Sequence, residues 1–227
     1  MWISRSRNFG RGFKSSINRV LGGKGSWVQD AKVDISLEPL NPRFLEPFSK
    51  CFMNIVLIGF RCAGKTVVGK QLADRLQRRF VDTDDLIESK EGQINEIVKS
   101  HGWDYFRAIE KEMIEEISKE DNLVIALGGG AVLDPNNVVN VEKNGVIIWL
   151  KAEPEVLRKR MEQDSRTIAS RPTLTGKGAL EELEDMMVFR NPFYHKAAKI
   201  QFDTSSMDVG AVVENILTVL KEKMGRI

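Results

Sequence analysis

The chain of 227 residues, 42% of them hydrophobic, is long enough for one domain with a substantial core and a modest appendage. Its apolar runs are all shorter than the roughly 18 residues that a membrane span requires, and its two cysteines are too few for a disulfide framework. These features exclude an integral membrane protein and a disulfide-stabilised secreted domain. The formal net charge is only +2. We therefore expect a cytoplasmic protein that binds no membrane.

The basic surplus is concentrated in residues 1–52, which we call the leader. The leader contains nine Lys or Arg and four Asp or Glu, a balance of +5, whereas residues 53–227 contain 25 and 28, a balance of −3. It could be a transit peptide, which would direct the protein to a plastid, or a basic arm that contacts nucleic acid. A third interpretation is that the leader is disordered or lies outside the working protein, because Met53 directly precedes the first predicted strand. Since it shows no recognition helix or interleaved aromatic residues, we expect no nucleic-acid partner.

The first predicted core element is the apolar strand Asn54–Ile58, and residues 59–66 follow it with the sequence GFRCAGKT. The spacing G-x-x-x-x-G-K-[ST], between a strand and a helical pattern over about 65–79, is that of a phosphate-binding P-loop. Backbone N–H groups of such a loop converge on an anion at a helix N-terminus, where the helix dipole also favours negative charge. Lys65 would reach the β- and γ-phosphates of a nucleotide, and the Thr66 hydroxyl would bind Mg²⁺.

Strands and helical patterns alternate along the rest of the chain. Strands are predicted around 80–81 and at 123–127, 146–150 and 200–202; helices are predicted over about 85–118, 136–143, 154–163 and 209–223, with one more helix before the last strand. This alternation predicts a parallel sheet covered on both faces by helices. In such sheets ligands bind beyond the carboxyl ends of the strands, so the residues that follow each strand are the candidates for function.

Two carboxylates, Asp82 and Asp84, follow the second predicted strand. At positions i and i+2 of an extended segment they would point to the same side. Beside a triphosphate, one could help hold the Mg²⁺ shell and the other could accept a hydrogen bond from a substrate hydroxyl. The alternative is structural, because Asp84 or Asp85 could cap the next helix.

Arg107 and Glu110 lie at i and i+3 of a predicted helix, where they would be neighbours. The planar fork of arginine suits a carboxylate ligand, and the glutamate would fix its orientation. A solvated surface ion pair is the alternative. After the third strand, Gly128, Gly129 and Gly130 would let the backbone approach a ligand closely, or would form a turn.

Six motifs in this order resemble the shikimate kinase family: the P-loop, Asp-x-Asp at 82–84, Phe-Arg-x-x-Glu at 106–110, Gly-Gly-Gly at 128–130, Arg-Pro at 171–172 and Arg-x-Pro-x-Tyr at 190–194. The resemblance covers residues 53–227. It implies a nucleoside-monophosphate-kinase-like fold, a three-layer α/β/α sandwich with a five-stranded parallel sheet. It also implies that a monomer uses ATP and Mg²⁺ to phosphorylate the 3-hydroxyl of shikimate in aromatic amino-acid synthesis. The alternatives are a kinase for another small hydroxy acid such as gluconate, and a kinase-like ligand-sensing domain of a regulator.

The resemblance assigns a role to each matching residue. Arg107 and Arg190 would bind the shikimate carboxylate, Arg160 would lie along adenine, and Arg171 would swing in from a lid over 164–178. The implied catalytic residues are Lys65, Asp84 and Arg171, and the implied metal ligands are Thr66 and Asp82. The implied nucleotide-binding residues are Cys62, Ala63, Gly64, Lys65, Thr66, Val67, Arg160 and Arg171; the implied substrate-binding residues are Asp84, Arg107, Glu110, Gly128, Gly129, Gly130 and Arg190.

Two positions depart from the family pattern. Cys62 stands in the P-loop where many relatives have glycine, and residues 203–206 stand where many relatives place a basic or amide side chain near adenine. Both departures concern nucleotide binding more than the identity of the acceptor.

Overall fold

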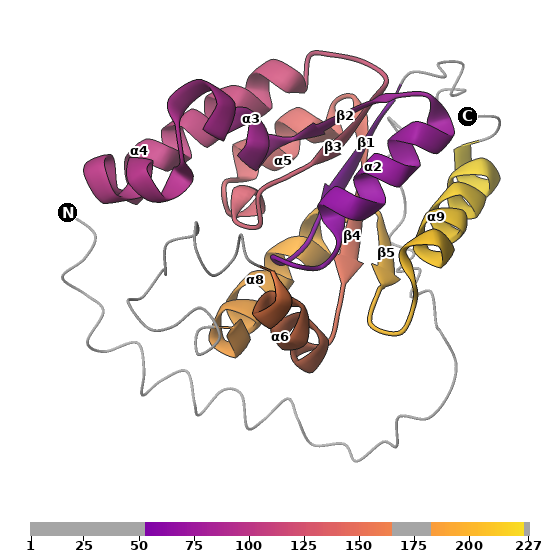
Figure 1. Ribbon diagram of the computed structural model, residues 1–227. Coiled ribbons are helices and arrows are strands. Elements are labelled where there is room, and N and C mark those ends of the chain that lie inside the picture. The colour runs from indigo at the N-terminus through magenta and orange to yellow at the C-terminus, as the bar shows by residue number, and fades with distance from the viewer. Residues whose placement is uncertain (1–52, 165–182, 225–227) are drawn as a thin grey trace. The chain divides into compact units, whose positions relative to one another are not determined.

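The computed structural model describes residues 53–164 and 183–224, and its core is a single parallel sheet (Figure 1). The strands in this part of the chain are β1 (Asn54–Ile58), β2 (Arg79–Asp82), β3 (Leu123–Ala126), β4 (Gly145–Lys151) and β5 (Ile200–Asp203). They lie in the order β2-β3-β1-β4-β5, and each neighbouring pair is parallel. The predicted five-stranded parallel sheet is therefore confirmed.

Helices cover both faces of the sheet, which gives the predicted three layers (Figure 1). The helices are α2 (Lys65–Leu76), α3 (Thr83–Glu91), α4 (Ile94–Ile117), the short 3₁₀ helix η2 (Ala131–Leu133), α5 (Pro135–Glu142), α6 (Pro154–Gln163), α8 (Leu183–Ala197) and α9 (Val209–Met224). Helices α2 and α9 pack together on one face, and α4 and α5 pack together on the other. Among the described residues, no helix is both long enough and apolar enough to cross a membrane.

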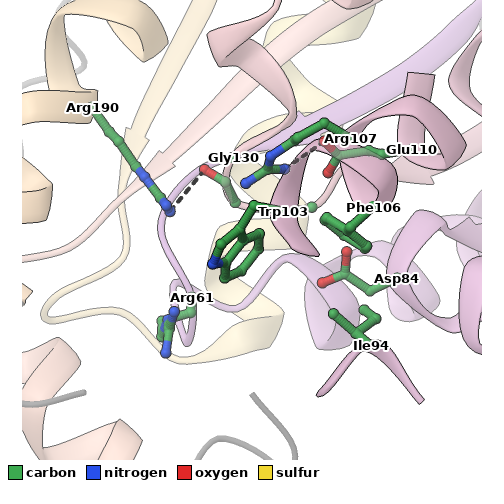
Figure 2. A pocket seen from close by; sticks show the side chains of 11 residues that line it. Arg61, Asp84, Ile94, Trp103, Phe106, Arg107, Glu110, Gly130 and Arg190 are labelled. Atoms are coloured by element: carbon green, nitrogen blue, oxygen red, sulfur yellow. Dashed lines mark hydrogen bonds and ion pairs between the residues drawn. The ribbon is translucent and has the colours of Figure 1, made fainter. Parts of the chain in front are cut away.

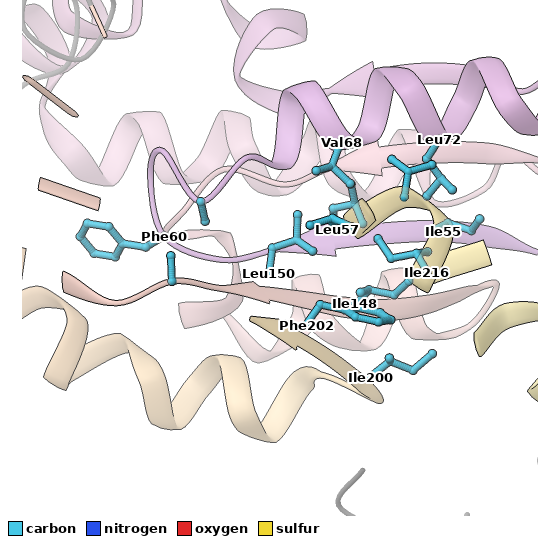
Figure 3. Close-up of a cluster of buried hydrophobic side chains, with 14 of the residues drawn as sticks. Ile55, Leu57, Phe60, Val68, Leu72, Ile148, Leu150, Ile200, Phe202 and Ile216 are labelled. Carbon is cyan, nitrogen blue, oxygen red and sulfur yellow. The ribbon is translucent and has the colours of Figure 1, made fainter. Parts of the chain in front are cut away.

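The central strand β1 is buried along its whole length. Ile55 and Leu57 enter the core beneath α2 and α9 (Figure 3), whereas Val56 and Ile58 enter the core beneath α4 and α5. Parallel strands between two helical layers are apolar on both faces, which explains the continuous hydrophobic run in the sequence. Burying each such side chain contributes about 1.5–3 kcal/mol. The strand therefore holds the loop at its carboxyl end on a rigid base.

A third cluster of buried side chains joins α3 to α4. It consists of Ile87, Ile94, Ile97, Phe106 and Ile109. This cluster fixes the helix pair that carries Asp84 and Arg107, so these two side chains project from a packed unit and not from loops.

The helix boundaries show where glycine and left-handed residues interrupt the predicted pattern. Helix α2 ends at Leu76, before the predicted end near residue 79, because Gln77 takes a left-handed φ of 53°. The region 85–118 forms two helices, since Gly92 ends α3 with a φ of 94°. Helix α4 is itself kinked at Gly102, which has a φ of 83°. These conformations favour glycine, so the interruptions at Gly92 and Gly102 follow from the sequence, whereas the one at Gln77 does not.

Candidate active site

The phosphate loop leaves the carboxyl end of β1 and leads directly into α2. Gly59 has a φ of 144°, and a Cβ atom there would lie 2.4 Å from the carbonyl oxygen of Leu150 in β4. A side chain at this position would therefore collide with the sheet. Lys65 Nζ donates hydrogen bonds to the carbonyl oxygens of Gly59 and Phe60, at 3.0 and 2.9 Å. These bonds keep the ammonium group at the loop.

Cys62 adopts a left-handed backbone conformation, which glycine takes more easily than other residues. Its φ is 59°, in the left-handed region that side chains disfavour. Two residues at the end of α6 contact it: Arg160 Nη1 donates to the carbonyl oxygen of Cys62, and Cys62 Sγ donates to Asp164 Oδ2, both at 3.4 Å. The loop therefore accommodates cysteine in a conformation that is easier for glycine.

Thr66 and Asp82, the two predicted metal ligands, lie side by side. Thr66 Oγ1 donates to Asp82 Oδ2 at 2.7 Å, although the residues belong to α2 and β2. Mg²⁺ prefers oxygen ligands and is commonly bound by one or two carboxylates together with water and substrate phosphates. This hydroxyl and carboxylate at the start of α2 fit that chemistry. Within 53–164 and 183–224, no cluster of three or more His, Cys, Asp or Glu side chains suited to a metal occurs.

Asp82 and Asp84 do not lie on one extended segment, so that expectation is wrong. Asp82 ends β2 and is the N-cap of α3, and its side chain accepts a hydrogen bond from the backbone N–H of Asp84 at 3.1 Å. Asp84 is already in the first helical turn. The suggestion that Asp84 or Asp85 caps the helix is also wrong, because Asp82 does so. The cap turns the chain between the two carboxylates, so Asp82 ends β2 whereas Asp84 projects from α3.

A pocket enclosing about 480 Å³ of empty space, part of it open to solvent, lies beside the P-loop (Figure 2). Every residue predicted to bind the acceptor contributes to its lining: Asp84, Arg107, Glu110, Gly128, Gly129, Gly130 and Arg190. Figure 2 shows these side chains arriving from α3, α4 and α8 around the glycine triplet that follows β3. Residues that are far apart in the sequence therefore share one site.

In the ion pair between Arg107 and Glu110, the glutamate side chain is buried. Arg107 Nη1 donates to Glu110 Oε2 at 2.5 Å, and the Glu110 side chain is 1% exposed, so a solvated surface pair is ruled out. Burial raises the pKa of Glu110; Arg107 opposes this rise, and the nearby Asp84 adds to it. Glu110 Oε1 has no hydrogen-bond partner among the described residues. The rings of Trp103 and Phe106 lie 5.4 and 5.1 Å from the Arg107 guanidinium and hold it by cation–π contact.

Arg190 approaches the pocket from α8 and is 4% exposed. Its Nη1 donates to the carbonyl oxygen of Gly129 at 3.3 Å, and its Nε has no hydrogen-bond partner among the described residues. Burial lowers the pKa of Arg190 from its ordinary value, yet arginine stays charged in proteins. Tyr194 Oη donates to the same carbonyl oxygen, and burial raises the pKa of Tyr194 to about 12. A buried guanidinium with an open N–H favours an anionic ligand.

The predicted adenine arginine, Arg160, lies against the P-loop. Besides Cys62, it contacts Thr204 in the turn after β5, where its Nη2 donates to the backbone carbonyl oxygen at 2.6 Å. Of the other predicted nucleotide-binding residues, Ala63 is buried, Gly64 has a left-handed φ of 97°, and Val67, in α2, is 53% exposed. Arg171 lies outside the described residues.

The pocket also contains residues that the sequence did not single out as ligand-binding: Arg61, Ile94, Trp103 and Phe106. Trp103 directly follows the Gly102 kink, and that glycine was the available signal for a change of direction. The apolar members could not be distinguished from core residues by periodicity, because a pocket wall and a core share the same composition.

The strand order, the phosphate loop and the cationic pocket at one rim of the sheet define a P-loop kinase. A model of the family described as shikimate kinase matches residues 61–221. The shikimate kinase of Caldanaerobacter subterraneus subsp. tengcongensis is 40% identical over 174 residues, covering 76% of this chain and 99% of that protein. Shikimate kinase 2 of Yersinia enterocolitica is 38% identical over 170 residues, covering 74% and 96%. The chain belongs to the shikimate kinase family.

Solved structures agree with this assignment. Shikimate kinase from Acinetobacter baumannii in complex with shikimate is 31% identical, with a TM-score of 0.70, over 77% of this chain and 96% of that chain. Shikimate kinase from Aquifex aeolicus is also 31% identical, with a TM-score of 0.64, over 77% and 100%.

Proposed function

We propose that this protein transfers the γ-phosphoryl group of ATP to the 3-hydroxyl of shikimate, and so supplies shikimate 3-phosphate for aromatic amino-acid synthesis. The observation that carries this proposal is the pocket in which Arg107 and Arg190 lie near Asp84, beside a P-loop. A small polyol carboxylate needs a cationic clamp at one end and an acceptor for its hydroxyl at the other. The family membership and the shikimate complex of the Acinetobacter relative support the same acceptor.

The two arginines are proposed to bind the acceptor carboxylate in different ways. Arg107 is held in one orientation by Glu110, so its remaining N–H groups form a preset fork. Arg190 offers its buried Nε–H and is held by the carbonyl oxygen of Gly129. The glycine triplet is proposed to add backbone contacts to the acceptor. It also leaves room for the pocket side chains, because a Cβ on Gly128 or Gly130 would meet Asp84, Glu110 or Arg107 at 2.3–2.8 Å.

Phosphoryl transfer is proposed to depend on position and charge, because the transition state is loose and its charge lies on oxygen atoms. Lys65 supplies positive charge at the loop, and Arg171, outside the described residues, is proposed to add more. Thr66 and Asp82 would hold Mg²⁺, which when bound neutralises charge on the phosphate oxygens. Asp84 orients the attacking hydroxyl and can accept its proton. We also propose that the enzyme is a cytoplasmic monomer, as the family resemblance implies.

A coupled assay of ADP release tests the proposal with shikimate, gluconate or no acceptor. We expect turnover with shikimate and a product heavier by one phosphate in mass spectrometry. Turnover of gluconate in place of shikimate would establish the rival kinase. Binding of ATP and shikimate without turnover would favour a ligand-sensing domain.

The metal site has its own test in the same assay. Chelation with EDTA should abolish turnover, and added Mg²⁺ should restore it. Asp82→Asn should raise the Mg²⁺ concentration needed for half-maximal rate, because a neutral amide binds Mg²⁺ less well than a carboxylate. An unchanged Mg²⁺ requirement would remove Asp82 from the metal site.

A further inference from the structure

Thr204, in the turn after β5, forms hydrogen bonds with the end of β4, with the P-loop and with Arg160 of α6. It is 3% exposed. Its backbone N–H donates to the carbonyl oxygen of Lys151 at the end of β4, at 2.8 Å. Its hydroxyl lies 2.9 Å from the same oxygen and 3.3 Å from the carbonyl oxygen of Ala63 in the P-loop. The turn is therefore tied to both the sheet and the phosphate loop.

Arg160 uses the same threonine as its main anchor. Its Nη2 donates to the Thr204 carbonyl oxygen at 2.6 Å, and its Nη1 donates to Thr204 Oγ1 at 3.2 Å and to the Cys62 carbonyl oxygen at 3.4 Å. The N–H bonds of a guanidinium lie in its plane, so these three oxygens fix the plane. Its faces take no part in the three bonds, and such faces stack on aromatic rings.

The Thr204 hydroxyl must both donate a hydrogen bond and accept one at this position. A hydroxyl donates one hydrogen bond and accepts others, so it can donate to the carbonyl oxygen of Lys151 or Ala63 while it accepts from Arg160. Valine has nearly the same shape but can do neither. In a valine variant, Nη1 of Arg160 would lose its bond to the hydroxyl and keep only the longer bond to the Cys62 carbonyl oxygen. The plane of the guanidinium would then be less well fixed.

We infer that Thr204 is a positioning residue for ATP, which orients the Arg160 guanidinium so that it stacks on the adenine base while the P-loop holds the phosphates. The inference rests on the proposed function and on the place along adenine that the family resemblance implies for Arg160; what it adds is the role of Thr204 in setting the plane of that guanidinium. Residues 203–206 carry no basic or amide side chain, so the turn would act on the base through Arg160.

Thr204→Val tests this inference by calorimetric titration with ADP and by steady-state kinetics. We expect the Kd for ADP and the KM for ATP to rise about fivefold to tenfold, which corresponds to the loss of one ordinary hydrogen bond. The KM for shikimate should stay within about twofold, and Thr204→Ser, which keeps the hydroxyl, should restore ADP affinity to within about twofold. Affinity for inorganic triphosphate, which lacks adenine, should not change.

Ser205→Ala is the matched control. Ser205 Oγ accepts from the backbone N–H of Glu153 at 2.9 Å, so it ties the same turn to the other end of α6. Because that bond does not involve Arg160, the control should leave the Kd for ADP unchanged.

A double-mutant cycle separates positioning from a general structural role. Arg160→Ala should weaken ADP binding, and Thr204→Val should add little in that background, because the two residues act through one contact. Additive effects, equal weakening of ADP and inorganic triphosphate, or unchanged ADP binding in Thr204→Val would overturn the inference. If valine prevents folding, Thr204→Ala takes its place in the cycle. A parent that binds ADP without phosphorylating shikimate would contradict the proposed function, while ADP binding would still decide the role of Thr204.

Discussion

Arg107 shows how one side chain acquires a function through its neighbours. Arg107→Lys keeps the charge but loses the fork that Glu110 orients. Because a hydrogen bond to a charged group contributes about 1.5–3 kcal/mol, we expect the KM for shikimate to rise about tenfold or more. The KM for ATP should change little. Steady-state kinetics with each substrate varied in turn measures both values.

Arg79→Lys is the matched control for this substitution. Arg79 pairs with Glu120, and both side chains are about half exposed, at 59% and 47%. Such exposed pairs contribute little, so neither KM should change. If Arg107→Lys raised both KM values equally, Arg107 would have a general structural role.

Asp84 is the residue proposed to act on the acceptor hydroxyl. Asp84→Asn keeps the size of the side chain and leaves the helix cap intact, because the cap is Asp82. General-base assistance is worth about 10² to 10⁴ in rate, so kcat should fall at least about a hundredfold with ADP affinity retained. Asp85→Asn, one residue further along α3, should keep kcat. A kcat for Asp84→Asn within about threefold of the parent would remove Asp84 from the chemistry.

Glu110 gives the protein a predictable dependence of stability on pH. Its folded-state pKa is raised above the ordinary value of 4.5, chiefly by burial. Its protonated form therefore contributes stability at low pH, and this contribution is lost as the pH rises through the folded-state pKa. Glu110→Gln resembles the protonated form at every pH. The melting temperature of the parent minus that of the variant should therefore decrease as the pH rises from about 4 to about 8.

Thermal unfolding of the parent, Glu110→Gln and Glu115→Gln across this pH range measures the effect. Glu115 forms an exposed pair with Lys119, so its variant should show a difference nearly independent of pH. A parent-minus-variant difference for Glu110→Gln that grew with pH would mean that the ion pair with Arg107 outweighs burial.

At the scale of elements, the loop after β3 sets the shape of the acceptor pocket. A Cβ on Gly130 would lie 2.3 Å from Arg107 Nη2, at the flexible end of that side chain. Gly130→Ala should therefore displace the guanidinium without preventing folding, because the φ of −107° suits alanine. We expect the KM for shikimate to rise about tenfold through the lost charge-assisted hydrogen bond.

Gly210→Ala serves as the control for this loop variant. Gly210 lies in the first turn of α9, and its new Cβ would lie 3.2 Å from a carboxylate oxygen of Asp208. The KM for shikimate should not change in this variant. An unchanged KM in Gly130→Ala would show that Arg107 finds an equivalent position beside the new methyl group.

At the scale of the whole molecule, residues 53–227 are predicted to suffice for folding and turnover. The two large hydrophobic cores are built from residues between Ile55 and Leu220, and the leader lies outside the described residues. A protein that starts at Met53 should keep the melting temperature and kcat of the full chain. Loss of soluble expression would show that the leader has a role in folding.

A slightly longer deletion serves as a positive control, because it should lower the melting temperature measurably. Removing residues through Asn54 takes away a buried side chain that donates to the carbonyl oxygen of Glu120 and accepts from the backbone N–H of Leu123. Two hydrogen bonds that anchor the start of the sheet, one of them buried, would be lost, so the melting temperature should fall.

The sequence by itself determined the alternation of elements, the P-loop and the order of the family motifs. These features are local: a buried strand such as β1 reads as a continuous apolar run, and a tight phosphate loop requires glycine at fixed spacing. The breaks at Gly92 and Gly102 were not predicted, although glycine takes a positive φ easily and the signal for them is therefore local. The set of residues gathered at the acceptor pocket followed from the same motifs.

Tertiary structure decided how those residues work. The bond between Thr66 and Asp82, the burial of Glu110 and the anchoring of Arg160 by Thr204 depend on distances between segments far apart in the chain. Whether an Arg–Glu pair at i and i+3 is a surface pair or a buried fork depends on what packs over it, and spacing carries no information on that point. Asp82, and not Asp84 or Asp85, caps α3 because β2 ends at Asp82 and the helix begins at the next residue.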